Sequence, residues 1–162
     1  MLFRDATPDD WPAIWSILRR VAAAGDTFCW ETDIGEDEAR RLWFKTPPGR
    51  TVVATDPDGT VLGTAYLVPT QRGPGAHVAN ASFAVDPARA GSGVGRALGG
   101  HVIEQARADG FRAMQFNAVV ETNTRAVALW RSLGFEVLAT VPGSFHHPTA
   151  GYVGMHIMHR RL

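Results

Sequence analysis

The sequence predicts an α+β (mixed α/β) fold built around one central sheet. Segments with apolar residues at helical spacing are interspersed with segments rich in β-branched and aromatic residues. Their order is one strand, two helices, three strands, helix, strand, helix and two final strands, which mixes both kinds of element instead of separating them. No internal repeat or low-complexity linker divides the 162 residues, so we expect a single domain over residues 1–162.

The first quarter of the chain predicts a strand and two helices. Leu2–Ala6 is the first strand, and Thr7-Pro8-Asp9-Asp10 then has the form of a helix start, with Thr as the N-cap and Pro in the first helical position. Apolar residues follow at helical spacing until Gly25, namely Trp11, Ile14, Trp15, Leu18 and Val21. Glu36–Phe44 is the second predicted helix, and Pro47-Pro48-Gly49 ends it.

The middle of the chain predicts three strands. Thr51–Thr55 and Thr60–Val68 flank Asp56-Pro57-Asp58-Gly59 and form a hairpin, and Val78–Val85 is the fourth strand.

The second half predicts two helices and three strands. A helix runs over Val94–Asp109, and the apolar stretch Ala113–Val120 is a central strand. The next helix has a buried face made of Ala126, Leu129, Trp130 and Leu133. Phe135–Val141 and Tyr152–His159 are the last two strands.

Composition excludes several classes of function. Lys plus Arg and Asp plus Glu number 16 each, so the formal net charge is zero. The sequence contains no basic stripe of the kind that binds nucleic acid or an anionic membrane. No apolar run reaches the roughly 20 residues of a membrane span, and the first residues do not form a signal peptide. The lone Cys29 suits a reducing compartment, so we expect a cytoplasmic protein. The adjacent His146 and His147 are poorly placed to share one ion, and no Cys–His cluster has zinc spacing, so we expect no metal.

A glycine-rich turn between the fourth strand and the following helix carries the chemistry. Gly91, Gly93 and Gly95 let the backbone approach a ligand closely, and the helix start offers unpaired N–H groups that suit a phosphate. The dinucleotide pattern G-x-G-x-x-G fails, because Arg96 and Leu98 stand where its last glycine belongs. A P-loop fails as well, since no Gly-Lys-Ser/Thr occurs.

The run Pro87-Ala-Arg-Ala-Gly-Ser-Gly-Val-Gly-Arg-Ala-Leu98 resembles motif A of the GNAT acetyltransferases, Gln/Arg-x-x-Gly-x-Gly/Ala. The resemblance implies acetyl-CoA as co-substrate, with its pyrophosphate held by backbone amides of Ala90, Gly91, Ser92, Gly93, Val94, Gly95 and Arg96. The basic or amide side chain of the motif is replaced by Ala90, and Arg89 or Arg96 could partly replace it.

A second stretch, Asn123-Thr-Arg-Ala-Val-Ala-Leu-Trp-Arg-Ser-Leu-Gly-Phe135, resembles the family's Asn-x-x-Ala-x-x-Leu-Tyr-x-x-x-Gly-Phe. The resemblance implies that Asn123 contacts the pantetheine arm. Trp130 stands where the family often has the Tyr that protonates the leaving thiolate. Because an indole N–H cannot deliver a proton, we interpret Trp130 as packing beside the cofactor, not as an acid.

The resemblance covers the whole chain and implies the GNAT fold. That fold has a twisted, mostly antiparallel sheet of about seven strands, four helices, and splayed strands four and five. In the family a bulge in strand four aims a backbone N–H at the thioester carbonyl. By position this N–H belongs to Phe83, and Ala84 and Val85 would pair with the pantetheine amides.

The remaining catalytic candidates are two amides from strands four and five and two carboxylates outside these strands. Alternation places Gln115, Asn117 and Val119 on one face of strand five, and Asn80 lies in strand four. Asn80 and Asn117 could hold a water or the acceptor, or be satisfied by neighbouring backbone. Glu121 and Glu31 are the nearest carboxylates that could act as a base.

The acceptor site should involve the loops Gly25–Glu31 and Ser144–Tyr152, with Trp30, Glu31, Phe145 and His146 as candidate contacts. Phe116-Asn117, Asn123 and Pro142-Gly143 also resemble a GNAT branch that acetylates proline-like amino acids. We therefore expect a small amine or amino acid as substrate, and a homodimer is possible. A protein N-terminal or lysine acetyltransferase, a non-catalytic acyl-CoA sensor and a structural interaction domain are the alternatives.

Overall fold

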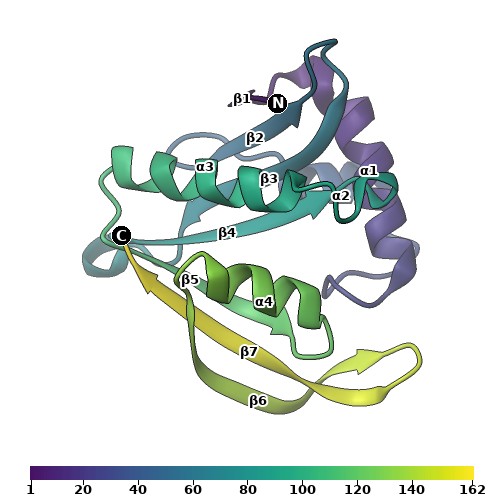
Figure 1. Ribbon diagram of the computed structural model, residues 1–162, viewed down its shortest axis with the longest axis vertical. Helices are drawn as coiled ribbons and strands as arrows, with labels where there is room; N and C mark the ends of the chain where they lie inside the picture. Colours follow the sequence, from purple (N-terminus) through teal and green to yellow (C-terminus); the bar gives the residue numbers. More distant parts are fainter.

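The computed structural model describes residues 1–162 and contains one seven-stranded sheet with four α-helices (Figure 1). The strands are β1 (Leu2–Asp5), β2 (Arg50–Thr55), β3 (Val61–Pro69), β4 (Val78–Val85), β5 (Ala113–Val120), β6 (Glu136–His147) and β7 (Gly151–Arg161). The helices are α1 (Trp11–Ala24), α2 (Glu36–Trp43), α3 (Val94–Ala108) and α4 (Thr124–Ser132). This order and the mixed fold class confirm the sequence prediction.

The sheet has the spatial order β1-β2-β3-β4-β5-β7-β6. Every neighbouring pair is antiparallel except β4 and β5, which are parallel. Helix α3 crosses the near face of the sheet in Figure 1, whereas α1 and α2 lie on the opposite face. No helix is long and apolar enough to span a bilayer.

Helix α1 begins much as its sequence predicts. Pro8–Asp10 forms a single 3₁₀ turn before it, and the Asp10 carboxylate accepts a hydrogen bond of 2.7 Å from the Thr7 N–H. Arg4 donates two hydrogen bonds, of 2.6 and 2.7 Å, to the same carboxylate. These bonds lower the pKa of Asp10 to about 2. Gly25, with φ of +66°, ends the helix in the left-handed region.

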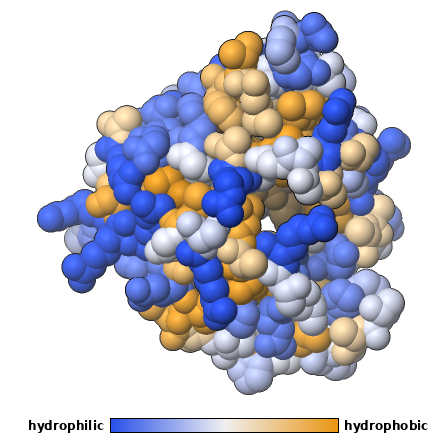
Figure 2. Space-filling view, viewed as in Figure 1, coloured by the Kyte–Doolittle hydropathy of each residue, from blue (hydrophilic) through white to orange (hydrophobic).

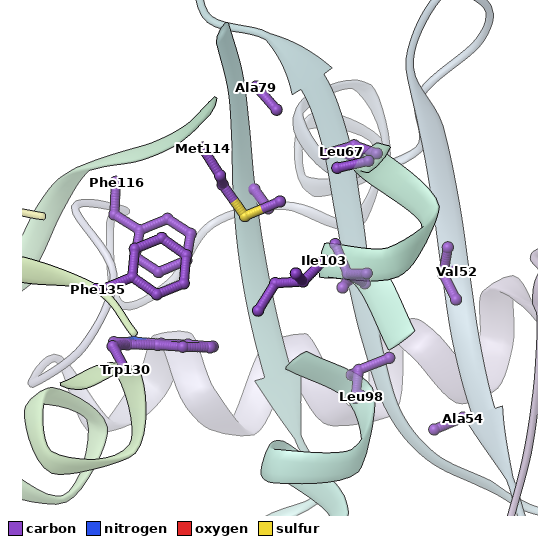
Figure 3. Packing of buried hydrophobic residues seen from close by; sticks show 14 of the residues in the cluster. Val52, Ala54, Leu67, Ala79, Leu98, Ile103, Met114, Phe116, Trp130 and Phe135 are labelled. Carbon is purple, nitrogen blue, oxygen red and sulfur yellow. The ribbon is translucent and has the colours of Figure 1, made fainter. Parts of the chain in front are cut away.

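Each face of the sheet carries its own core. On the α3 and α4 face, buried side chains from β2 to β5 pack against both helices, as Figure 3 shows for part of this cluster. On the α1 and α2 face, the core includes the fully buried Trp43 and the strand residues Val53 and Ala84. Successive residues such as Val52 and Val53 belong to different cores, because side chains alternate across a strand.

Strands β4 and β5 splay apart, as expected. They pair only at Val78↔Ala113 and Ala79↔Met114 and diverge beyond that point. The bulge expected in the fourth strand is absent, since the β3–β4 register runs unbroken from Gly63↔Val85 to Pro69↔Ala79.

A bulge occurs instead in β5. Phe116 pairs with Met158 and Val119 with His156, so Asn117 and Ala118 together oppose a single residue of β7. The extra residue reverses the alternation. Val119 therefore packs with the α3 and α4 core, and the expectation that it shares a face with Gln115 and Asn117 is corrected.

The C-terminal hairpin is longer than predicted. Strand β6 continues to His147 and β7 begins at Gly151, so most of the expected loop Ser144–Tyr152 is strand. The pairing slips between Val141↔Met155 and Phe145↔Val153, where Pro142 and Gly143 lie. Pro142 lacks an N–H for the ladder, and Gly143 adopts φ of +61°. This pair bends the strand without ending it.

Candidate active site

A cavity of about 570 Å³ passes between β4 and β5 where the two strands separate. Its lining comes from both faces of the sheet, so it joins the α3 and α4 face to the α1 and α2 face. Figure 2, drawn from the side of α3, shows a hollow in this region of the surface. We call the two parts the cradle half, on the side of α3 and α4, and the acceptor half, on the side of α1 and α2.

The cradle half is built by the glycine-rich turn. Gly91 and Gly93 have φ of +83° and +87°, which residues with a Cβ rarely adopt. The first backbone bond of α3 runs from the Ala97 N–H to the Gly93 carbonyl. The N–H groups of Val94, Gly95 and Arg96 therefore have no partner within the helix and lie at its positive end. This part of the cavity suits an anion.

Ser92 differs from its neighbours in the turn. Its N–H donates to the carbonyl of Arg89 at 3.2 Å, and its hydroxyl donates to the same oxygen at 2.6 Å. It does not line the cavity, whereas Ala90, Gly91, Gly93, Val94, Gly95 and Arg96 do. The expected set of cradle residues is thus brought together with Ser92 left out.

Asp86 fixes the turn to the rest of the molecule. Its carboxylate accepts a hydrogen bond of 2.9 Å from the Ala88 N–H and pairs with Arg20 of α1 at 2.9 Å. Burial opposes ionisation of Asp86, but these two partners outweigh it and lower its pKa. The β4–α3 turn is therefore held from the opposite face of the sheet.

Strand β4 presents an unpaired edge to the cavity. The Asp86 N–H donates to Leu62, and the Thr70 N–H donates to Val78, so even-numbered residues of β4 form their hydrogen bonds with β3. The N–H and C=O groups of Phe83 and Val85 point the other way, into the gap left by β5. Ala84 pairs with β3 and cannot hold a ligand through its backbone, which corrects the expectation for that residue.

Asn123 and Trp130 line the cradle half from α4. The Asn123 side-chain oxygen accepts a hydrogen bond of 3.1 Å from the Ala126 N–H and caps the helix, which leaves its amide NH₂ free to donate. Trp130 is buried against the rings of Phe83, Phe116 and Phe135, at centroid distances of 4.7, 4.8 and 6.0 Å. Figure 3 shows it beside the rings of Phe116 and Phe135. Its position among these rings agrees with its interpretation as packing.

Three arginines supply all the charge in the cavity lining. Arg89, Arg96 and Arg125 lie beside the glycine-rich turn and the start of α4. Arg96 is oriented by a 2.8 Å hydrogen bond that it donates to the Ser132 hydroxyl. The cradle half is therefore positive, through both side chains and the helix dipole.

The acceptor half is uncharged. Its lining consists of Thr27, Phe28, Tyr66, Asn80 and Ser82, from the loop after α1 and from β3 and β4. Tyr66 and Ser82 are directly opposite each other in the β3–β4 register. Burial raises the pKa of Tyr66 despite a hydrogen bond with Ser82, so the phenol keeps its proton.

Several predicted acceptor contacts lie elsewhere. Trp30 packs against Phe28 and Trp43 behind the cavity wall, and Glu31 is exposed. Phe145 is buried in a small cluster with Val120 and Val153. His146 is exposed and stacks on Tyr152. None of the four predicted contacts lines the cavity.

Glu121 is also outside the cavity. Its side chain accepts a hydrogen bond from the Gly154 N–H of β7, next to the backbone bond from its own N–H to the Gly154 carbonyl. The catalytic candidates Asn80 and Asn117 do line the cavity, and the Asn117 side chain accepts a 2.7 Å hydrogen bond from Gln115. The lining contains no Asp, Glu or His, and no group of three or more His, Cys, Asp or Glu side chains is placed to hold a metal.

Among the lining residues that sequence reasoning missed are Thr27, Phe28, Ser82 and Arg125. Two residues of the loop Gly25–Glu31 line the cavity, but they are not the residues of that loop that the sequence singled out. Ser82 was recoverable, because it lies two residues from Asn80 in the same strand and therefore on the same face. Arg125 lies two residues after the motif Asn123, and its charge beside a predicted anion site was a usable signal.

Comparison with known proteins agrees with this architecture. The acetyltransferase (GNAT) family model matches residues 11–135. The N-acetyltransferase aca1 of Schizosaccharomyces pombe is 32% identical over 125 residues, which is 68% of this chain and 60% of the yeast protein. The chain thus corresponds to less than two thirds of that relative's length.

Three solved structures share the fold along nearly the whole chain. A GCN5-related N-acetyltransferase from Kribbella flavida is 56% identical, with a TM-score of 0.95 over 99% of this chain and 97% of that one. A ribosomal-protein-alanine N-acetyltransferase from Brucella melitensis is 25% identical, with a TM-score of 0.84 over both full chains. A phosphinothricin acetyltransferase from Sinorhizobium meliloti, solved with acetyl-CoA, is 27% identical, with a TM-score of 0.88 over 99% of this chain and 88% of that one.

The family match extends from α1 through the glycine-rich turn to the end of α4, and so includes both sequence motifs and the splayed strands. The chain therefore belongs to the acetyltransferase (GNAT) family of acyltransferases.

Proposed function

We propose that the protein transfers the acetyl group of acetyl-CoA to the amine of a small molecule or amino acid. The observation that carries this proposal is the cavity through the sheet, which connects an anion-binding cradle to an uncharged acceptor half. Because the cavity is lined from both faces of the sheet, the two substrates are proposed to enter from opposite sides. They would meet where β4 and β5 separate.

The cradle half supplies the contacts that acetyl-CoA needs. The N–H groups at the start of α3 receive the pyrophosphate, and Arg89, Arg96 or Arg125 adds positive charge. The free amide of Asn123 and the unpaired edge of β4 at Phe83 and Val85 bind the amides of the pantetheine arm as an added strand would. Bound acetyl-CoA in the Sinorhizobium meliloti protein supports this choice of co-substrate.

Direct transfer requires stabilisation of the oxyanion that forms at the thioester carbonyl. The Phe83 N–H is the proposed donor, because it points into the gap and has no partner in β3. No bulge is needed to expose it, since the divergence of β5 already does so. Asn80 and Asn117 are proposed to position the acceptor or a water with their amides.

Thiolate release does not require Trp130. The indole cannot give up a proton, whereas a thiol with a pKa near 8.5 is a tolerable leaving group without a dedicated acid. Tyr66 is the only phenol in the lining, and its raised pKa keeps it protonated. It is the proposed source of a proton if the departing thiolate needs one.

The size of the cavity favours a small acceptor. The cavity measures about 570 Å³, and the acetylated end of the pantetheine arm occupies part of that space. Pockets of roughly 300–1,000 Å³ suit a drug-sized molecule. The part that remains suits a small amine better than a folded protein surface, although the Brucella melitensis likeness makes a peptide N-terminus the alternative to test.

Two measurements test the proposal together. Acetyl-CoA at a hundredfold excess over its dissociation constant should stabilise the native state by about 2.7 kcal/mol. Thiol release should then be followed with acetyl-CoA against separate pools of small amines, amino acids and short peptides. No thermal stabilisation by millimolar acetyl-CoA would contradict the cofactor assignment, and stabilisation without thiol release from any pool would contradict the transferase assignment.

A further inference from the structure

The charges around the cavity are distributed unequally between its halves. All three charged side chains of the lining are arginines of the cradle half. The acceptor half offers two hydroxyls, a phenol, an amide and a phenyl ring, from Thr27, Ser82, Tyr66, Asn80 and Phe28. An acceptor that carries a full charge would therefore be desolvated there without a counter-ion.

No carboxylate lines the cavity to supply the missing negative charge. Asp26, adjacent to Thr27 and its hydrogen-bond partner at 3.0 Å, is exposed and outside the lining. Glu121 is held by the Gly154 N–H. The Tyr66 wall of the acceptor half has a positive charge against it, because the Lys45 ammonium lies 4.6 Å from the centre of the Tyr66 ring. An ammonium ion is thus disfavoured from both sides.

The same lining offers nothing to remove a proton from an ammonium. It contains no carboxylate and no imidazole, and burial keeps the Tyr66 phenol neutral. An alkylamine with a pKa near 10.4 is neutral in only about one molecule in a thousand at pH 7.4. A weakly basic amine is already neutral at that pH, so nearly all of its molecules are in the form that can react.

The wall of the acceptor half is aromatic. Phe28 packs against Trp30 and Trp43 at centroid distances of 5.1 and 5.6 Å, and Trp43 meets Tyr66 edge-on at 5.1 Å. Phe28 and Tyr66 are the two members of this cluster that reach the cavity. Such a surface suits a flat aromatic body, and the side chains of Asn80 and Ser82 can bind the N–H groups of a neutral amine.

From these four features we infer that the acceptor is a weakly basic amine on an aromatic body, such as an arylamine or aryl hydrazide, bound as the free base. This inference rests on the proposed function. The neutral nitrogen attacks the thioester carbonyl, a C–N bond forms and the C–S bond breaks. One nitrogen proton passes to the departing sulfur, directly or through water, so that the amine and acetyl-CoA give the amide and free CoA. The nitrogen becomes acidic once it has attacked, so no strong base is required.

Aniline and benzylamine provide a matched test, because they share a ring and differ mainly in the basicity of the amine. At pH 7 we expect kcat/KM for aniline to exceed that for benzylamine by at least about tenfold. The aniline rate should change little between pH 6 and 9, whereas the benzylamine rate should rise about tenfold per pH unit as the free base accumulates. Phenylalanine and an Ala-initiated peptide are the charged and protein-like comparisons.

Two variants locate the effect in the acceptor half. Ser82→Ala should raise KM for aniline several-fold and leave the thermal shift by acetyl-CoA unchanged. Glu121→Gln, which keeps an acceptor for the Gly154 N–H, should leave both quantities unchanged. A loss of turnover in Glu121→Gln, with folding preserved, would show that a carboxylate base exists and would overturn the inference.

The outcomes separate this inference from the proposed function. Faster turnover of benzylamine, phenylalanine or the peptide than of aniline at pH 7 would overturn the inference and keep the acetyltransferase assignment. Absence of thiol release with every amine, in protein that acetyl-CoA stabilises, would overturn both.

Discussion

The two halves of the cavity are built by different means. The cradle half comes from one continuous stretch, in which β4 ends, a glycine-rich turn follows and α3 begins. Most of its polar groups are backbone amides, supplemented by arginines. The acceptor half is assembled from a loop after α1 and from two strands, and its distinguishing polar groups belong to side chains. The contrast indicates that the proposed cofactor site is encoded locally in the sequence, whereas the proposed substrate site depends on distant segments.

The largest expected effect is on stability, and it compares how tightly side chains pack beneath the two halves of the cavity. Trp130 is 7% exposed among three aromatic rings, whereas Trp30 is half-buried in a loop. Trp130→Ala should lower the free energy of unfolding by about 3–5 kcal/mol, as deletion of a large buried aromatic residue does. Trp30→Ala should lower the free energy of unfolding by a clearly smaller amount. Urea unfolding of both variants measures the difference, and equal losses would show that the acceptor half is packed as tightly as the cradle half.

The next effect tests whether backbone approach defines the cradle half. A Cβ on Gly95 would meet only Leu129 and Val85, at 3.5 and 3.6 Å, so Gly95→Val should fold normally while it narrows the cavity. Gly100→Val is the control, since that position in the same helix has no neighbour within 4 Å of a Cβ. We expect acetyl-CoA stabilisation of about 2.7 kcal/mol to fall to about 1.4 kcal/mol or less in Gly95→Val, which is tenfold weaker binding. Equal thermal shifts by acetyl-CoA in Gly95→Val and Gly100→Val would contradict the proposal that acetyl-CoA binds against the backbone of the cradle half.

A smaller effect tests the link between the two faces. Asp86→Asn removes the ion pair with Arg20 and weakens the cap on Ala88, which should cost about 1 kcal/mol at pH 7. The pKa of Asp86 lies below its ordinary 3.8, so its stabilisation is present above that pH and is lost as the pH falls through the lowered value. The difference in unfolding free energy between wild type and variant should therefore shrink below about pH 4. If the difference in unfolding free energy stays constant down to pH 2, the ionised Asp86 carboxylate does not stabilise the link between the two faces.

The smallest effect distinguishes the charged half from the neutral one. Arg125→Gln removes an exposed cation beside the cradle and should weaken acetyl-CoA binding about two- to fivefold at low salt, in line with exposed ion pairs. The loss should diminish at 1 M salt, because screening reduces the contribution of exposed charges. Titration calorimetry at both salt concentrations provides the test. Equal losses at low and high salt would mean that Arg125 acts through packing.

Much of the fold was predictable because local patterns agreed with one another. The bounds of β4 and β5 match the predicted Val78–Val85 and Ala113–Val120, and α2 and α3 each end one residue before the predicted end. Helix α1 begins three residues after the predicted Pro8, because a 3₁₀ turn precedes it. The errors in the predicted strands occurred where the same local sequence is compatible with two backbone structures. The predicted strand Phe135–Val141 stops just before Pro142-Gly143, but β7 pairs on both sides of this pair and keeps the strand continuous. The bulge at Asn117 and Ala118 leaves no mark in the sequence, since it depends on the register with β7.

What the sequence determined by itself is the cradle. Backbone amides, left-handed glycines and a helix start follow from residue order within about ten positions. Motif spacing therefore singled out Gly91–Arg96 and Asn123 without coordinates, and all of these residues except Ser92 line the cavity. Tertiary structure alone decided which residues of the acceptor half face inward. Phe28 reaches the cavity and Trp30 does not, and Ser82 faces it while Glu121 is held on Gly154. Those outcomes depend on how α1, β3 and β7 pack around the splay, because long-range contacts fix the direction of a side chain, whereas local order fixes only its backbone.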